Sequence, residues 1–188
     1  MRGKQIRFIF AMSMLVGIFA ITALSSAHAD ESKAAKIARA MRAAPAAISQ
    51  HATTADVDWT VLRSGSNGWL CRPGSAPGDT HPECDDEVWV RLMKALDSKA
   101  EFKPERLGIS YMFQGDAPVN NADPFDTKRD AGEIWGEEGP HLMLVLPDPK
   151  MLEGFSDDPS NGGPYLMWRG TPYAHLMVPA PHGRKKKK

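Results

Sequence analysis

The chain has 188 residues, of which 42% are hydrophobic and 24% charged, and its 23 basic and 23 acidic residues give a net charge of zero. This length is enough for one domain with an ordinary core and too short for two large domains. The first 29 residues hold three basic and no acidic residues, so residues 30–188 carry 20 basic and 23 acidic residues, a net charge of −3. Because nucleic-acid-binding domains are basic, we expect no nucleic-acid partner.

Residues 1–29 have the three parts of a secretory signal peptide. Arg2, Lys4 and Arg7 form a positive segment, residues 8–24 are almost all apolar, and Ala27-His28-Ala29 is a small-residue cleavage site. This order of parts is typical of a leader that is removed during secretion. The sequence therefore predicts cleavage near Ala29 and export to the periplasm or the extracellular medium.

Residues 30–50 form the first segment of the predicted mature chain, and 31–44 indicate an amphipathic helix. Small apolar residues recur every three or four positions, and Pro45 ends the pattern. Basic side chains cover the opposite side, and such faces are usually solvated. Since the apolar side is mostly alanine, we expect this helix to pack loosely in front of the main domain.

The next elements are short strands around a proline- and glycine-rich loop. Residues 57–63 and 68–72 have strand character, and the chain's two cysteines, Cys71 and Cys84, enclose the loop. Exported proteins work in oxidising compartments, which favours a Cys71–Cys84 disulfide. The spacing of 12 residues between the cysteines is not that of a zinc site or of a C-x-x-C redox motif.

The rest of the chain predicts one helix and several strands. Residues 85–97 have an acidic first turn and an apolar stripe containing Trp89, as in a packed helix. Predicted strands follow at 108–114, 141–146, 165–169 and 173–178. Between the first two of these strands, residues 115–139 form a long polar loop, and loops of this length are often functional. With no β-α-β alternation, the pattern predicts an α+β fold: a single domain over 51–181 with a mainly antiparallel sheet, one or two packed helices, long loops and one disulfide.

Residues 182–188 end the chain with a run of positive charge. Like charges repel one another and no apolar residue is available for burial, so the sequence predicts a disordered tail. Contact with an anionic surface is the alternative function for this run. The basic residues are Arg184, Lys185, Lys186, Lys187 and Lys188.

Four segments carry a resemblance to a group of exported bacterial proteins. They are Ile37-Ala38-Arg39-Ala40-Met41, Asn67-Gly68-Trp69, Gly162-Gly163-Pro164 and Thr171-Pro172-Tyr173-Ala174-His175-Leu176-Met177-Val178-Pro179. The resemblance spans residues 36–179 and implies export and a single domain. The group is uncharacterised, so the resemblance transfers no activity, and the cationic end of this chain is not part of its pattern.

A repeated His-Leu-Met tripeptide supplies the sharpest candidate site. It occurs at His141–Met143 and His175–Met177. Alternate residues of a strand share one face, so adjacent strands would bring His141, Met143, His175 and Met177 to the same side. Imidazole with thioether ligands is a copper-type set, which makes copper the candidate cofactor. The alternative is structural, because methionine readily fills cores.

Motifs for common enzyme classes are not found. The sequence has no H-E-x-x-H segment and no phosphate-binding glycine loop. We therefore expect an exported non-enzymatic protein that binds a ligand or a metal. The alternative is a periplasmic hydrolase in which His141 or His175 works with a nearby carboxylate, Asp116 or Glu137.

Overall fold

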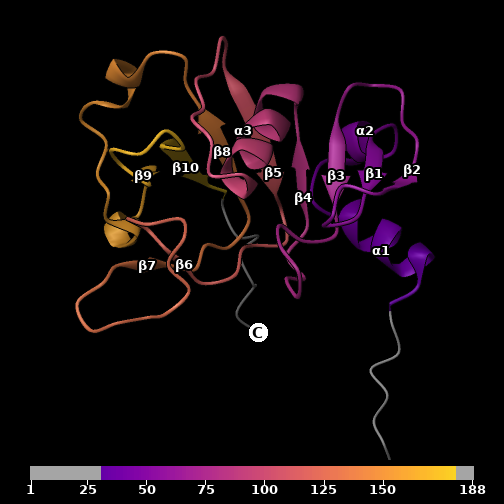
Figure 1. Cartoon of the computed structure of the whole chain (residues 1–188), viewed down its shortest axis with the longest axis horizontal. Helices are drawn as coiled ribbons and strands as arrows, with labels where there is room; N and C mark the ends of the chain where they lie inside the picture. The colour runs from indigo at the N-terminus through magenta and orange to yellow at the C-terminus, as the bar shows by residue number, and fades with distance from the viewer. Residues whose placement is uncertain (1–30, 181–188) are drawn as a thin grey trace, which may run out of the picture. The chain divides into compact units, whose positions relative to one another are not determined.

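The computed structural model describes residues 31–180, whose strands form an eight-stranded sheet and a separate two-stranded hairpin (Figure 1). The predicted signal peptide and residues 182–188 lie outside the described residues. The strand order is β2-β1-β3-β4-β5-β8-β10-β9, and neighbours are antiparallel except for the parallel pair β1–β3. The strands are β1 Thr53–Ala55, β2 Val61–Arg63, β3 Leu70–Arg72, β4 Glu83–Asp85, β5 Gly108–Met112, β8 His141–Val145, β9 Tyr165–Met167 and β10 His175–Pro179. This confirms the predicted α+β fold with a mainly antiparallel sheet.

The helices and the remaining short elements surround this sheet. The α-helices are α1 Lys33–Ala40, α2 Ala46–Ser49 and α3 Glu87–Asp97. Two 3-10 turns follow late in the chain, η1 Pro149–Leu152 and η2 Pro159–Asn161. The predicted long loop contains a small hairpin of β6 Val119–Asn120 and β7 Trp135–Gly136. Among the described residues, none of the helices is long and apolar enough to cross a membrane.

Helix α3 covers one face of the sheet and forms the main core with it (Figure 1). It begins at Asp86, whose carboxylate accepts a hydrogen bond from the Trp89 backbone N–H at 2.8 Å and so caps the helix. Strands β5 and β8 alternate buried and half-buried residues, as expected when one face is packed against a helix. At Gly108 a Cβ atom would lie 2.7 Å from Val145 Cγ1 and 2.8 Å from Val88 Cγ1, so α3 approaches β5 more closely than a side chain would allow.

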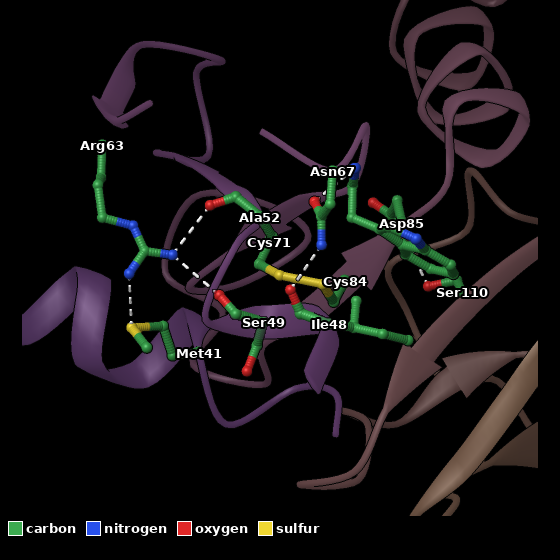
Figure 2. The surroundings of a disulfide bond; sticks show 11 residues. Met41, Ile48, Ser49, Ala52, Arg63, Asn67, Cys71, Cys84, Asp85 and Ser110 are labelled. Atoms are coloured by element: carbon green, nitrogen blue, oxygen red, sulfur yellow. Dashed lines mark hydrogen bonds between the residues drawn. A yellow bond between two sulfur atoms is a disulfide. The ribbon is translucent and has the colours of Figure 1, made fainter. Parts of the chain in front are cut away.

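The opposite face carries the disulfide and helix α1 (Figure 2). Cys71 and Cys84 are directly opposite each other on β3 and β4, and their sulfur atoms are bonded, which confirms the predicted pairing. Both cysteines are fully buried in a cluster with small residues that include Ala40 and Ala43 of the α1 region. Alanines let the helix approach the bridge closely.

Polar contacts also hold α1 in the same compact unit as the sheet. Lys36 pairs with Asp56 at 2.7 Å, and Arg39 donates to the Pro73 carbonyl oxygen at 2.8 Å and pairs with Glu31. The sequence predicted a solvated basic face and loose packing. In the structure two of these basic residues bind parts of the domain instead, because the short alanine side chains bring the helix within reach.

Figure 2 shows how the chain between α1 and β3 is fastened around the disulfide. The Arg63 guanidinium donates to the carbonyl oxygens of Ser49 and Ala52, both at 2.9 Å, and to Met41 Sδ at 3.0 Å. The Asn67 side chain donates to the Ile48 carbonyl oxygen at 2.8 Å. The accepting backbone oxygens belong to the last turn of α2 and to the segment that follows it, so these bonds fix the end of α2 against β2 and the turn before β3.

Candidate ligand cavity

A cavity of about 350 Å³ lies between α3, the sheet and the long loop. Its deeper lining residues come from α3, β4, β5, β8, β9 and β10, and its outer ones from the disulfide loop, the end of α3 and residues 124–125. Most of the lining is apolar, with aromatic and thioether side chains, and a few polar groups are placed among them. The apolar and aromatic members are Ala76, Trp89, Met93, Leu96, Met112, Val119, Pro124, Phe125, Met143, Met167 and Trp168.

His175 is the buried imidazole of this cavity. It is 1% exposed at the start of β10, and its Nδ1 donates to the Tyr173 carbonyl oxygen at 2.9 Å. A carbonyl oxygen can only accept, so Nδ1 carries the proton and Nε2 presents a lone pair. Nε2 has no hydrogen-bond partner among the described residues. Burial lowers the pKa of His175 to about 4, so the ring is neutral at physiological pH.

Two tryptophans pack edge-on against His175. The ring centroids of Trp89 and Trp168 lie 5.1 and 4.9 Å from that of His175, with interplanar angles of 84° in both cases. Trp168 Nε1 donates to the Asn120 carbonyl oxygen at 3.0 Å, whereas Trp89 Nε1 has no acceptor within the described part of the chain. A buried polar atom without a partner costs about 1–3 kcal/mol. Two residues of the cavity lining, His175 and Trp89, therefore each hold one buried ring nitrogen without a partner in the described chain.

Glu83 is the buried carboxylate of the cavity wall. It is 1% exposed on β4 and forms an ion pair with the Arg72 guanidinium, which is fully buried on the neighbouring strand β3. Burial raises the pKa of Glu83 more than the positive charge of Arg72 lowers it. The guanidinium also lies over the Trp59 ring, 4.0 Å from its centroid. The buried charge of Arg72 is thus stabilised by an ion pair with Glu83 and by a cation–π contact with Trp59.

Asp116 is the second carboxyl group that lines the cavity, just beyond the end of β5. One of its oxygens accepts a hydrogen bond from the Ala117 N–H at 2.7 Å, and the other accepts none from residues 31–180. Burial, reinforced by the negative charges of Asp79 and Glu83, raises the pKa of Asp116 to about 7. Near neutral pH, Asp116 is therefore a mixture of the protonated and the ionised forms.

A second buried polar pair lies on the same sheet face but outside the cavity lining. The Ser110 hydroxyl donates to Asp85 Oδ1 at 2.5 Å, and Asp85 Oδ2 has no partner among the described residues. Burial, together with the charge of Glu83, raises the pKa of Asp85 well above its usual value. The surroundings of Asp85 therefore favour its neutral form more than water does.

The sheet brings the four predicted metal-ligating residues to one face but not to one point. Met143 and Met177 are directly opposite each other, and His141 is opposite Pro179. Pro179 lies four residues along β10 from His175, so the two histidines are displaced by about 13 Å along the strand direction. Met143 and His175 line the cavity, whereas His141 and Met177 do not. No group of three or more His, Cys, Asp or Glu side chains within residues 31–180 is arranged to hold a metal ion.

Of the residues proposed for the hydrolase alternative, two line the cavity and two do not. His175 and Asp116 line one cavity, and His141 and Glu137 lie outside its lining. His141 is fully buried, and its Nδ1 donates to the Gly139 carbonyl oxygen at 2.6 Å. Within residues 31–180 no carboxylate bonds to either imidazole, although a carboxylate is the usual device for orienting a catalytic histidine.

Sequence reasoning missed Trp89 and Glu83 as cavity residues. Trp89 was expected only in the buried stripe of its helix. Glu83 belongs to a strand too short to give a pattern. A glutamate preceding a buried cysteine was the single signal available.

The chain matches no protein-family model, no curated protein and no solved structure.

Proposed function

We propose that the protein is exported and binds a small organic ligand in the cavity beneath α3 without transforming it. The observation that carries the proposal is a mostly apolar cavity of about 350 Å³ whose lining includes His175 and Trp89, two residues with buried ring nitrogens that have no partner among the described residues. Ligand sites are typically mostly apolar hollows of about 300–1,000 Å³ with a few well-placed polar groups.

The binding function is favoured over hydrolysis by the state of the imidazole. A general base works best with a pKa near the operating pH, and burial lowers that of His175 to about 4. Its Nδ1 is held by a backbone carbonyl oxygen, so no carboxylate stabilises the imidazolium that base catalysis would form. Hydrolysis of 4-nitrophenyl acetate by the wild type and by His175→Gln tests this choice. We expect equal rates at the level of free amino acids; a rate above that level that disappears in the variant would favour the hydrolase.

Tryptophan indole N–H signals in a ¹H–¹⁵N NMR spectrum test ligand binding directly. Indole and 2-phenylethanol are suitable neutral probes because both combine an aromatic ring with a hydrogen-bonding group. We expect either probe to shift the Trp89 and Trp168 indole signals, while the signal of Trp69, which packs against Tyr111 on the other sheet face, stays in place. If neither probe moves the Trp89 signal at millimolar concentration, the cavity is closed to ligands and the proposal fails.

Copper is the second candidate, and the strand register favours a smaller set of ligands than the four that the sequence predicted. His175 is directly opposite Met167 in the β9–β10 pairing, and Met143 lines the same cavity. A neutral imidazole lone pair beside two thioethers suits Cu(I). His141 has the same backbone bond and the same unpartnered Nε2 but does not line the cavity, so it is a matched control. In a titration with Cu(I) against a competing chelator, His175→Ala should remove any uptake and His141→Ala should not; equal uptake by parent and His175→Ala rules out this site.

A further inference from the structure

We infer that the ligand of this cavity is an organic amine: a protonated nitrogen attached to an apolar or aromatic body. The inference rests on the proposed binding function and adds the chemical class of the ligand. It follows from which polar groups the cavity wall contains, which of them are already bonded, and which charge they carry.

Acceptors outnumber donors in the deeper part of the cavity. The acceptors are the carboxylates of Glu83 and Asp116. The indole N–H of Trp89 is the one unsatisfied donor among the buried residues of the lining. Trp168 Nε1 is already bonded to Asn120. A ligand that complements this wall has to be rich in donors, and a primary ammonium group supplies three.

The charge of the cavity wall also favours a cation, because acidic residues predominate in the lining. Glu83 and Asp116 face the cavity, and Asp97 lies near its outer part. Lys99 is the one basic residue in the lining; it is exposed, with its Nζ 4.8 Å from the centroid of the Phe125 ring. Arg72 is bonded to Glu83 and does not line the cavity. A cation bound here would therefore meet more negative than positive charge.

Asp116 is the group that would gain most from a bound cation. One of its oxygens has no hydrogen-bond partner in the described chain, and its surroundings disfavour the charged form. An ammonium nitrogen within hydrogen-bond distance would favour the carboxylate, as an adjacent opposite charge does in general. Asp116 thus supplies the acceptor and the counter-charge together.

Aromatic side chains provide a second means of holding a cation or an aromatic body. Trp89, Trp168 and Phe125 line the cavity from α3, the end of β9 and the long loop. Aromatic faces attract cations by about 0.5–2 kcal/mol, and their edges and faces also pack against a ligand ring. The four methionines of the lining are flexible and can adapt to the shape of such a body.

Three probes of nearly the same shape separate this inference from its alternatives. 2-Phenylethylamine is a cation, 2-phenylethanol is neutral and phenylacetate is an anion. We expect isothermal titration calorimetry at pH 8 to give an affinity for the amine at least roughly tenfold above that for the alcohol, because a charge-assisted hydrogen bond is stronger than a neutral one. Phenylacetate should bind more weakly than the alcohol.

Two variants of the whole chain assign the preference to Asp116. Asp116→Asn keeps the size of the side chain but removes its charge, and it should reduce the amine-to-alcohol affinity ratio to near one. Asp130→Asn removes the same charge from an exposed position of the same loop that does not line the cavity, and should keep the wild-type ratio. Circular dichroism and thermal unfolding of each variant confirm that it is folded.

The possible outcomes distinguish this inference from the proposed function. If the alcohol shifts the Trp89 signal and the amine binds no better than the alcohol, binding stands and the amine inference is overturned. If none of the three probes binds, the proposed function itself fails. If the amine preference survives in Asp116→Asn, the assignment to Asp116 is wrong.

Discussion

Replacing Arg72 with methionine tests the buried charge pair at the edge of the cavity. The side chains of Arg72 and Glu83 are 0% and 1% exposed, so neither ion is solvated when its partner is lost. Methionine keeps most of the length and the apolar stem of arginine but removes the charge. The substitution leaves Glu83 as an unpaired carboxylate in the interior.

The expected loss of stability is large because the pair is fully buried. Removing one partner of a buried ion pair costs about 3–5 kcal/mol. Loss of the guanidinium from its place over the Trp59 ring contributes on the order of 1 kcal/mol more. We expect the free energy of unfolding of Arg72→Met to fall by about 3–5 kcal/mol, since methionine packing recovers part of the aromatic contact.

Urea unfolding at pH 7, followed by tryptophan fluorescence, measures this loss. Arg169→Met is the matched control, because the Arg169–Asp157 pair is 46% and 59% exposed and such pairs contribute below about 1 kcal/mol. Adding Glu83→Gln to Arg72→Met should restore part of the stability, because an amide is less costly to bury than a carboxylate. If Arg72→Met loses no more than Arg169→Met, the pair is hydrated and the reasoning is refuted.

Three further predictions concern the disulfide, Asp116 and the N-terminus. Replacing Cys71 and Cys84 with serine should lower the free energy of unfolding by about 3 kcal/mol in urea, chiefly because the unfolded chain loses a constraint; an unchanged midpoint would contradict this. Because the pKa of Asp116 is raised from 3.8 to about 7, the folded protein holds a proton there that the unfolded chain releases, and stability falls as pH rises through this window. The stability of Asp116→Asn relative to the wild type should therefore increase from pH 4 to pH 7 and then level off, by at most about 4 kcal/mol in pH-dependent unfolding; a flat difference would show that Asp116 is not buried. Intact-mass spectrometry of the exported protein should give a mature N-terminus at Asp30, and a retained leader would contradict the signal-peptide prediction.

The longer strands and α3 could be predicted because their sequences repeat with the period of their structure. Strands β5, β8 and β10 each have five residues, which is enough for a recognisable apolar run or alternation. Strand β1 was not predicted, because its three residues, Thr53-Thr54-Ala55, include no large apolar side chain. The strand predicted at 57–63 begins only at Val61, because the chain turns before it: the Asp56 N–H donates to the Thr60 carbonyl oxygen at 2.8 Å.

Strand β4 shows why part of the site could not be predicted. Its three residues are Glu83, Cys84 and Asp85, and all are buried although two are acidic. No hydropathy pattern predicts burial of such a segment. It becomes stable only when Arg72 pairs with Glu83, the Ser110 hydroxyl bonds to Asp85, and the disulfide fills the opposite face. Each of these partners lies on a neighbouring strand, so the burial of β4 depends on sheet pairing that local sequence does not specify.

The two histidines show that the cavity, like the burial of β4, could not be predicted from local sequence. His141 and His175 occupy identical tripeptides, both are buried, both donate from Nδ1 to a carbonyl oxygen two residues earlier, and both leave Nε2 unpartnered. An unpartnered imidazole nitrogen is therefore not by itself a sign of a site in this protein. What distinguishes His175 is the space beside it, bounded by Trp89 on α3 and by Asp116 beyond β5. Because that space exists only after α3 has packed across the sheet, the proposed ligand site depends on the packing of the helix and not on the repeated motif.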